Sequence, residues 1–247
     1  MNPTMRAPLG AALAVLVALS VLAASPLLVA VVTCGIVVMV AIGWPELLEL
    51  PSRRGTRTVM VLTGIAGVAM ALWSPGSFSP VEGIATVAAL GVFASFVHQM
   101  LRPDRSDLTA SLTGTASGAL LTGLSACWVQ ASALIATDAA QRSELAACAV
   151  ILAVVLALLA PPLHPVVTSS VAVLAAIGTA AVLLPAAGTA LLPSLVAGAV
   201  IGAGTAATHR LLSSLLLARE PVPSLTVAAA PVATAGVVVL LVARLVA

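Results

Sequence analysis

The sequence predicts an all-α fold, a bundle of about nine helices that cross a lipid membrane, and three observations support this prediction. Hydrophobic residues make up 61% of the 247 residues and charged residues only 7%, whereas about 25% of the residues in a soluble domain are charged. Nine apolar segments come near the length of about 20 residues that a membrane-spanning helix needs. Most of the prolines fall between these segments, where a helix can end.

The apolar segments follow one another through short loops. They are Leu9–Ala24, Leu27–Gly43, Thr58–Trp73, Val81–Met100, Ser111–Ala136, Leu145–Ala160, Val166–Leu184, Thr189–Thr208 and Thr226–Val246. Since no polar stretch is long enough for a separate soluble domain, we expect one integral membrane domain over residues 1–247. The first segment, preceded by Arg6, also resembles a secretory signal peptide, and eight helices would remain if it were cleaved.

The arginines predict how the bundle is oriented in the membrane. With the N-terminus placed inside, eight of the ten arginines fall on the inner side. Because all loops are short, the positive-inside rule applies. We therefore expect the inner membrane of a bacterial cell, a cytoplasmic N-terminus and an outer C-terminus. Trp44 and Trp73 then fall at opposite membrane interfaces, where tryptophan is enriched.

The most polar of the apolar segments carries a stripe of small and hydroxyl-bearing residues. Its members are Ser111, Thr115, Gly118, Thr122 and Ser125. Spacings of three and four residues place all of them on one face of a helix. Two interpretations fit this face: a polar lining for the path of a solute, or a surface that lets a neighbouring helix approach closely.

A second candidate site consists of polar residues at the predicted inner ends of the helices. Its members are His98, Arg102, Asp104, Arg105, Asp107, His164, His209 and Arg210. In a closed bundle they would form one polar inner mouth, where arginine can bind an anion or a lipid phosphate. Alternatively, they are helix ends that meet water and headgroups, and Asp107 caps the helix that follows it.

Two further features predict contacts between helices. Gly198 and Gly202 form a GxxxG pattern, which favours close helix approach. Gln130 is the one strongly polar side chain well inside an apolar segment, and we expect it to hydrogen-bond across helices.

The sequence offers little support for several other classes of function. No two histidines have the spacing of metal ligands, and the three cysteines lie in apolar segments without a CxxC pair, so we expect no metal, disulfide or cofactor. Common nucleotide-binding and hydrolase motifs are absent, so no catalytic residue is assigned. Ionisable residues are nearly absent from mid-membrane positions, which argues against an ion-coupled pump. A net charge of +2, without a basic run interleaved with aromatics, does not indicate nucleic-acid binding.

The loop from Gly43 to Pro51, with the sequence GWPELLELP, and the arginines after it resemble a family of uncharacterised multi-pass membrane proteins of high-GC Gram-positive bacteria. The similarity runs over most of the chain. It implies a membrane fold and carries no activity with it.

A second resemblance covers about residues 40–130. Trp44, Glu46 and Leu47, the pair Arg54-Gly55 and the later charged loop are similar to the N-terminal half of phosphatidate cytidylyltransferases. This implies a lipid-modifying enzyme with its site at the cytoplasmic face. The C-terminal signature of that family is rich in lysine, aspartate and glycine, and nothing after Glu144 matches it.

These observations leave three hypotheses. The first is a non-enzymatic membrane protein, either a small permease or an accessory subunit. The second is a lipid-modifying enzyme related to phosphatidate cytidylyltransferases. The third is a structural partner of another membrane protein, or of a second copy of this chain. The expected ligands are the bilayer itself and a lipid headgroup or small solute.

Overall fold

The computed structural model describes residues 6–73, 80–103, 106–134, 138–160 and 164–246, and these residues are almost entirely helical. The helices are α1 (Arg6–Leu22), α2 (Pro26–Leu47), α3 (Arg53–Leu72), α4 (Pro80–Met100), α5 (Leu108–Leu124), α6 (Cys127–Leu134), α7 (Ala139–Leu158), α8 (Pro165–Ala186), α9 (Leu191–Ser213), the short 3₁₀ helix η2 (Leu216–Arg219) and α10 (Pro223–Val246). The predicted all-α helical bundle is confirmed.

Seven helices in the described part of the chain are long and apolar enough to cross a membrane, namely α2, α3, α4 and α7 to α10. Helix α1 is shorter, with 17 residues. The remaining predicted segment, Ser111–Ala136, is divided between α5 and α6. The break falls at Ser125, whose hydroxyl donates to the carbonyl of Thr122 at 2.6 Å. Such a bond competes with the backbone ladder of the helix, and serine spacing alone does not reveal it.

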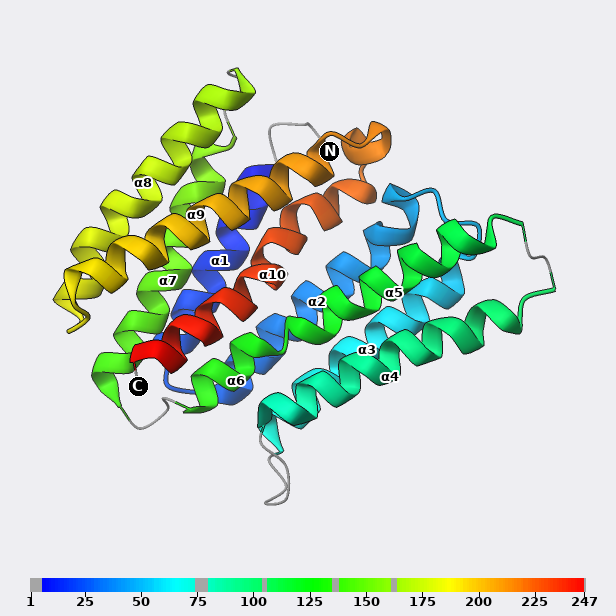
Figure 1. Ribbon diagram of the computed structural model, residues 1–247, viewed down its shortest axis with the longest axis horizontal. Coiled ribbons are helices and arrows are strands. Elements are labelled where there is room, and N and C mark those ends of the chain that lie inside the picture. Colours follow the sequence, from blue (N-terminus) through cyan, green and yellow to red (C-terminus); the bar gives the residue numbers. More distant parts are fainter. Residues whose placement is uncertain (1–5, 74–79, 104–105, 135–137, 161–163, 247) are drawn as a thin grey trace.

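Consecutive long helices run in opposite directions, and the short α6 continues the direction of α5 (Figure 1). As a result, the start of α1 and the α2–α3, α4–α5, α7–α8 and α9–α10 connections lie at the same end of the bundle. We call this the arginine-bearing end, because Arg6, Arg53, Arg54, Arg57, Arg102, Arg210 and Arg219 lie there. The predicted clustering of arginines at one end of the bundle is therefore present. The assignment of this end to the cytoplasm stays a prediction.

Helix α10 lies in the middle of the bundle, where it contacts α1, α2, α6 and α9. Its alanines from Ala228 to Ala230 are buried, because a methyl side chain lets neighbouring helices approach closely. Helix α1 packs against α7 and α10, and its Ala14 and Val17 are fully buried. Removal of this first helix would therefore expose the buried faces of both neighbours.

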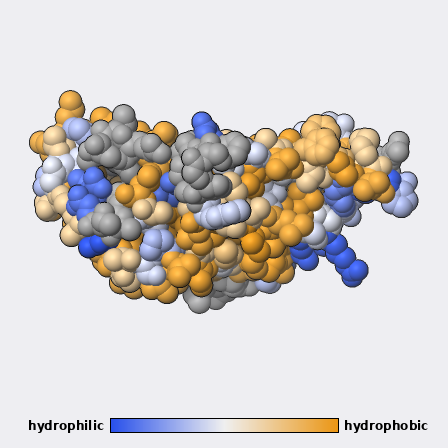
Figure 2. Space-filling view, turned by 90° about the horizontal axis from the view of Figure 1, so that it is seen from below, coloured by the Kyte–Doolittle hydropathy of each residue, from blue (hydrophilic) through white to orange (hydrophobic). Residues whose placement is uncertain are grey.

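The outer surface is mainly apolar. In the view of Figure 2, apolar residues cover most of the described surface, and hydrophilic residues form small patches among them. Large apolar side chains such as Phe93 and Leu174 are 65% and 68% exposed. A soluble monomer rarely exposes large continuous apolar patches, so this surface fits contact with lipid chains.

Three expectations about single residues need correction. Trp44 lies in the last turn of α2 as expected, but it is buried against neighbouring helices rather than exposed to headgroups, and its Nε1 donates to the carbonyl of Gly114 at 2.8 Å. Trp73, at the end of α3, is exposed as expected. Gln130 is buried, but its Oε1 has no hydrogen-bond partner among the described residues, so the expected bond across helices is not formed by this atom. Asp107 precedes α5, but its side chain makes no capping bond.

Candidate functional site

A buried polar network joins α3, α4 and α5 near the arginine-bearing end. At its centre Thr115 bonds the hydroxyl of Thr56 at 2.9 Å and accepts from Nε2 of Gln99 at 3.1 Å. All three side chains are fully buried. Since buried polar groups are expensive to leave unpaired, these bonds fix the relative positions of the three helices.

Arg102 closes the network on the side of the α4–α5 loop. Its Nη1 donates to Oε1 of Gln99 at 2.8 Å and to the hydroxyl of Ser111 at 3.1 Å. The arginine is half-buried, whereas Ser111 is fully buried. One nitrogen of the guanidinium therefore bonds to the buried network, and the arginine side chain is only partly exposed to the surroundings.

His98 is held against the start of α3. Its Nε2 lies 2.8 Å from the hydroxyl of Ser52. Gly55 makes this position possible, because a Cβ atom there would fall 1.8 Å from Cε1 of the ring. Arg102, two residues after the end of α4, contacts different neighbours, Gln99 and Ser111.

The stripe on α5 is buried against neighbouring helices. The hydroxyl of Thr122 donates to the carbonyl of Met60 in α3 at 2.9 Å. A Cβ atom at Gly118 would lie 2.7 Å from Sδ of Met60 and 2.8 Å from Nε1 of Trp44. Ser111, Thr115, Thr122 and Ser125 are all fully buried. The geometry therefore favours the interpretation as a helix-contact face over that as a solute path.

The residues of the predicted inner mouth are divided among separate places. Arg102 belongs to the polar network, whereas His98 bonds Ser52 in front of α3. His164 is exposed immediately before α8, and Asp107 is exposed before α5. His209 is buried near α1 and α10. Asp104 and Arg105 lie outside the described residues.

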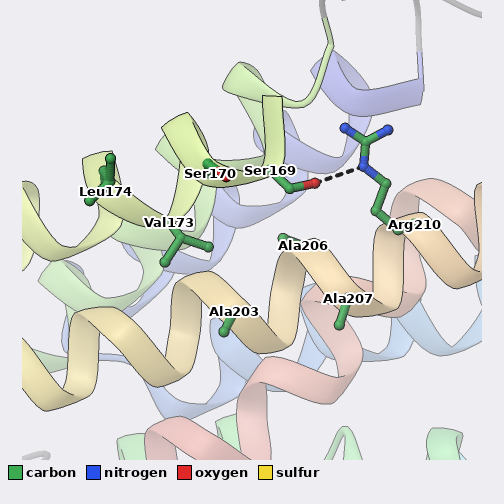
Figure 3. A pocket seen from close by; sticks show the side chains of 8 residues that line it. All are labelled: Ser169, Ser170, Val173, Leu174, Ala203, Ala206, Ala207 and Arg210. Carbon is green, nitrogen blue, oxygen red and sulfur yellow. Dashed lines mark hydrogen bonds between the residues drawn. The ribbon is translucent and has the colours of Figure 1, made fainter. Parts of the chain in front are cut away.

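Arg210 occupies the polar end of a groove between α8 and α9 (Figure 3). Its Nε donates to the hydroxyl of Ser169 at 2.9 Å. Its Nη2 donates to the carbonyl of Pro165 at 2.6 Å and to the hydroxyl of Thr168. Three bonds to one neighbouring helix hold the guanidinium in a defined orientation, which a flexible surface arginine lacks.

The groove itself has a volume of about 550 Å³. Its lining consists of Ser169, Ser170, Val173, Leu174, Ala203, Ala206, Ala207 and Arg210. The apolar side chains extend away from the arginine along both helices (Figure 3). A groove with one cationic end and an otherwise mainly apolar lining matches an amphiphilic ligand with an anionic head.

The sequence indicates Arg210 as a candidate but does not indicate its partners. Thr168 and Ser169 lie on the preceding helix, and no spacing pattern connects them to α9. The network partners Gln99 and Thr56 were missed for the same reason, although Gln99 directly follows His98 in the sequence. Within the described residues, no group of three or more histidine, cysteine, aspartate or glutamate side chains could hold a metal ion.

No protein-family model, curated protein or solved structure matches this chain. The two resemblances inferred from the sequence therefore stay predictions. The fold and its apolar surface define a multi-pass α-helical membrane protein.

Proposed function

We propose that this protein is a non-enzymatic accessory membrane protein that binds a phospholipid in the groove between α8 and α9. The observation that supports this most directly is the position of Arg210, fixed by Ser169 and Thr168 at the polar end of an apolar groove. The acyl chain lies along Val173 and Ala203, and the phosphate meets the guanidinium.

The depth of Arg210 fits this assignment. It lies in the last turn of α9, a helix long enough to cross the membrane. The end of such a helix meets the headgroup region, where the lipid phosphates are. The guanidinium uses Nε and Nη2 for its bonds to α8, and no bond of Nη1 to another described residue is present. This nitrogen can donate to a phosphate oxygen, and such charge-assisted bonds are among the strong ones.

The close packing of the α5 stripe against neighbouring helices favours an accessory role over that of a permease. Its hydroxyls bond within α5 or to α3, and its glycine faces Met60 and Trp44. A solute path along this face would require α3 and α5 to separate and would break those bonds.

The experiment compares lipid retention by the full-length protein and its variants. Protein in nanodiscs containing phosphatidylglycerol is transferred to mild detergent, and retained lipid is measured by native mass spectrometry. Arg210→Ala removes a charge-assisted contact worth about 1.5–3 kcal/mol, so we expect retention to weaken by about tenfold or more. Ala203→Phe keeps the charge and fills the groove, and it is expected to reduce retention as well.

Arg53→Ala is the matched control, because Arg53 is another arginine at the same end with a side chain 54% exposed. It is expected to retain lipid as the wild type does. Equal retention by the wild type, Arg210→Ala and Ala203→Phe would contradict the proposal. Conversion of the bound lipid to a product would instead favour the alternative, a lipid-modifying enzyme related to phosphatidate cytidylyltransferases.

A further inference from the structure

Arg6 is a buried cation whose donors are incompletely paired. The residue is only 6% exposed. Its Nε and Nη2 have no hydrogen-bond partner among the described residues. Burying a charge is strongly unfavourable unless the charge is paired and hydrogen-bonded. A partner for this guanidinium is therefore required.

The direction of Arg6 follows from helix packing. Gly10 lies one turn later on the same face of α1. A Cβ atom at Gly10 would fall 2.8 Å from the carbonyl oxygen of Ala228, so this face of α1 lies directly on α10. The two helices run in the same direction (Figure 1). One turn before Gly10, Arg6 is therefore directed toward the first turns of α10.

A second polar group at this place also lacks a partner. His209, in the last turns of α9, is 8% exposed, and its Nδ1 has no hydrogen bond among the described residues. The ring lies against the backbone of Val227. Pro231 has no N–H and leaves the carbonyl of Val227 without its helical donor. This free carbonyl explains why the imidazole lies here. It leaves Nδ1, on the other side of the ring, without a partner among the described residues.

Several positive charges lie close to Arg6 and His209. The charge of Arg219, which ends η2, acts on Arg6, and the charges of Arg6 and Arg210 act on His209. The N-terminus of α10 adds the positive end of its helix dipole. The preceding residues, 1–5, include no aspartate or glutamate, and Glu220 next to Arg219 is exposed.

We propose that a phosphate-type oxyanion binds between the first turn of α1, the end of α9 and the start of α10, with Arg6 as its main ligand. Arginine suits this role because its planar fork donates two parallel bonds to phosphate oxygens. Nδ1 of His209, when protonated, supplies a further donor, and Arg219 supplies a second cation. The anion is either the headgroup of a phospholipid or free inorganic phosphate.

This site is independent of the groove between α8 and α9. Arg210 is directed toward α8, whereas the next residue back, His209, is directed toward α10. Arg210→Ala is therefore expected to lower lipid retention in the groove and to leave the anion site occupied. Failure of one proposal does not imply failure of the other.

The test measures anion binding by the full-length protein and by Arg6→Met, Arg6→Lys and Arg219→Ala. Inorganic phosphate is titrated by calorimetry into delipidated protein in detergent, and phospholipid is counted by native mass spectrometry after nanodisc extraction. Arg6→Met is expected to weaken binding at least tenfold, Arg6→Lys to recover part of it, and Arg219→Ala to weaken it less. Arg53→Ala serves as the control.

The two sources of phosphate give different results. Loss of one retained phospholipid in Arg6→Met, without heat from inorganic phosphate in the wild type, assigns a lipid headgroup. Saturable heat from inorganic phosphate that Arg6→Met abolishes assigns the free anion. If Arg6→Met fails to fold, Arg219→Ala and Arg6→Lys carry the same comparison. Wild type that binds neither probe, or variants that bind both as the wild type does, would overturn the proposal.

Discussion

The indole Nε1 of Trp128 donates a hydrogen bond of 2.8 Å to the carbonyl of Val232, 104 residues further along the chain. Trp128 is fully buried and joins the short helix α6 to the central helix α10. One turn beyond Val232, Gly236 leaves the space that the indole ring fills. The hydrogen bond of Trp128 thus attaches α6, which follows the break in the fifth predicted segment, to the buried central helix α10.

We expect Gly236→Ala to destabilise the protein. Its Cβ would lie 2.7 Å from Cδ1 of Trp128, and a buried indole cannot move aside freely. Overpacking of this kind typically costs about 1–3 kcal/mol. The free energy of unfolding in detergent measures the effect. Gly35→Ala is the control, because its added Cβ would meet no atom within 4 Å beyond its own stretch of helix, and alanine in a helix interior is expected to stabilise by about 0.5–1 kcal/mol.

Substitutions of Thr115 test whether the polar network holds α3, α4 and α5 together. Thr115→Val leaves the buried Nε2 of Gln99 and the hydroxyl of Thr56 with one partner fewer. The expected loss of stability is about 1–3 kcal/mol. Thr113→Val, two residues earlier on the exposed face, bonds only to its own helix and should change stability by less than about 0.5 kcal/mol. Equal effects of the two substitutions would show that the network has no structural role.

Leucine at Gly198 tests the assignment of the GxxxG pattern to an internal contact. A Cβ atom at Gly198 would lie 2.6 Å from Cβ of Ala180 and 2.8 Å from the carbonyl of Ala176. Gly198→Leu should therefore separate α8 from α9 and weaken lipid retention in their groove. Gly204→Leu, with open space at its Cβ, should do neither. A change in oligomeric state with unchanged stability would support the hypothesis of a partner protein instead.

The left-handed backbone of Glu49 predicts a stabilising substitution. This residue follows α2 with φ of 54°, a conformation that is unfavourable for residues other than glycine. Glu49→Gly relieves that strain at the expense of chain entropy, and we expect a net gain of about 0.5–1 kcal/mol in unfolding free energy. Glu46→Gly should destabilise, because it removes the carboxylate that pairs with Arg57 at 2.5 Å. A loss of stability in Glu49→Gly would contradict this interpretation.

Hydropathy predicted the long helices because a bilayer requires every backbone polar group to be bonded within a segment. It did not predict the division of the fifth segment into α5 and α6. The order of the helices then placed the arginines at one end. The spacing of Thr115 and Thr122 predicted their common face, but not what that face contacts. Their partners, Thr56 and the carbonyl of Met60, belong to a helix about sixty residues earlier. Pairings at such separations leave no trace in local periodicity.

The same limit explains why the residues of the predicted inner mouth lie at separate places in the fold. Sequence position places His209 and Arg210 at one helix end, yet neighbouring residues on a helix point in different directions. Arg210 meets the serine and threonine of α8, whereas His209 is buried toward α10. The burial of Arg6 depends on the contact between Gly10 and Ala228, at opposite ends of the chain. These distinctions require the three-dimensional arrangement.

Cysteine accessibility in sealed membranes tests most directly whether the chain is a membrane-spanning bundle whose arginine-bearing end lies on one side of the membrane. Cys34, Cys127 and Cys148 are first replaced by alanine, and single cysteines are then introduced at Arg54, Arg219, Ala139 and Ala190, which are all exposed. We predict that an impermeant reagent labels positions 54 and 219 from the cytoplasmic side and positions 139 and 190 from the outside. Labelling of positions 54 and 219 from opposite sides of the membrane would contradict this topology.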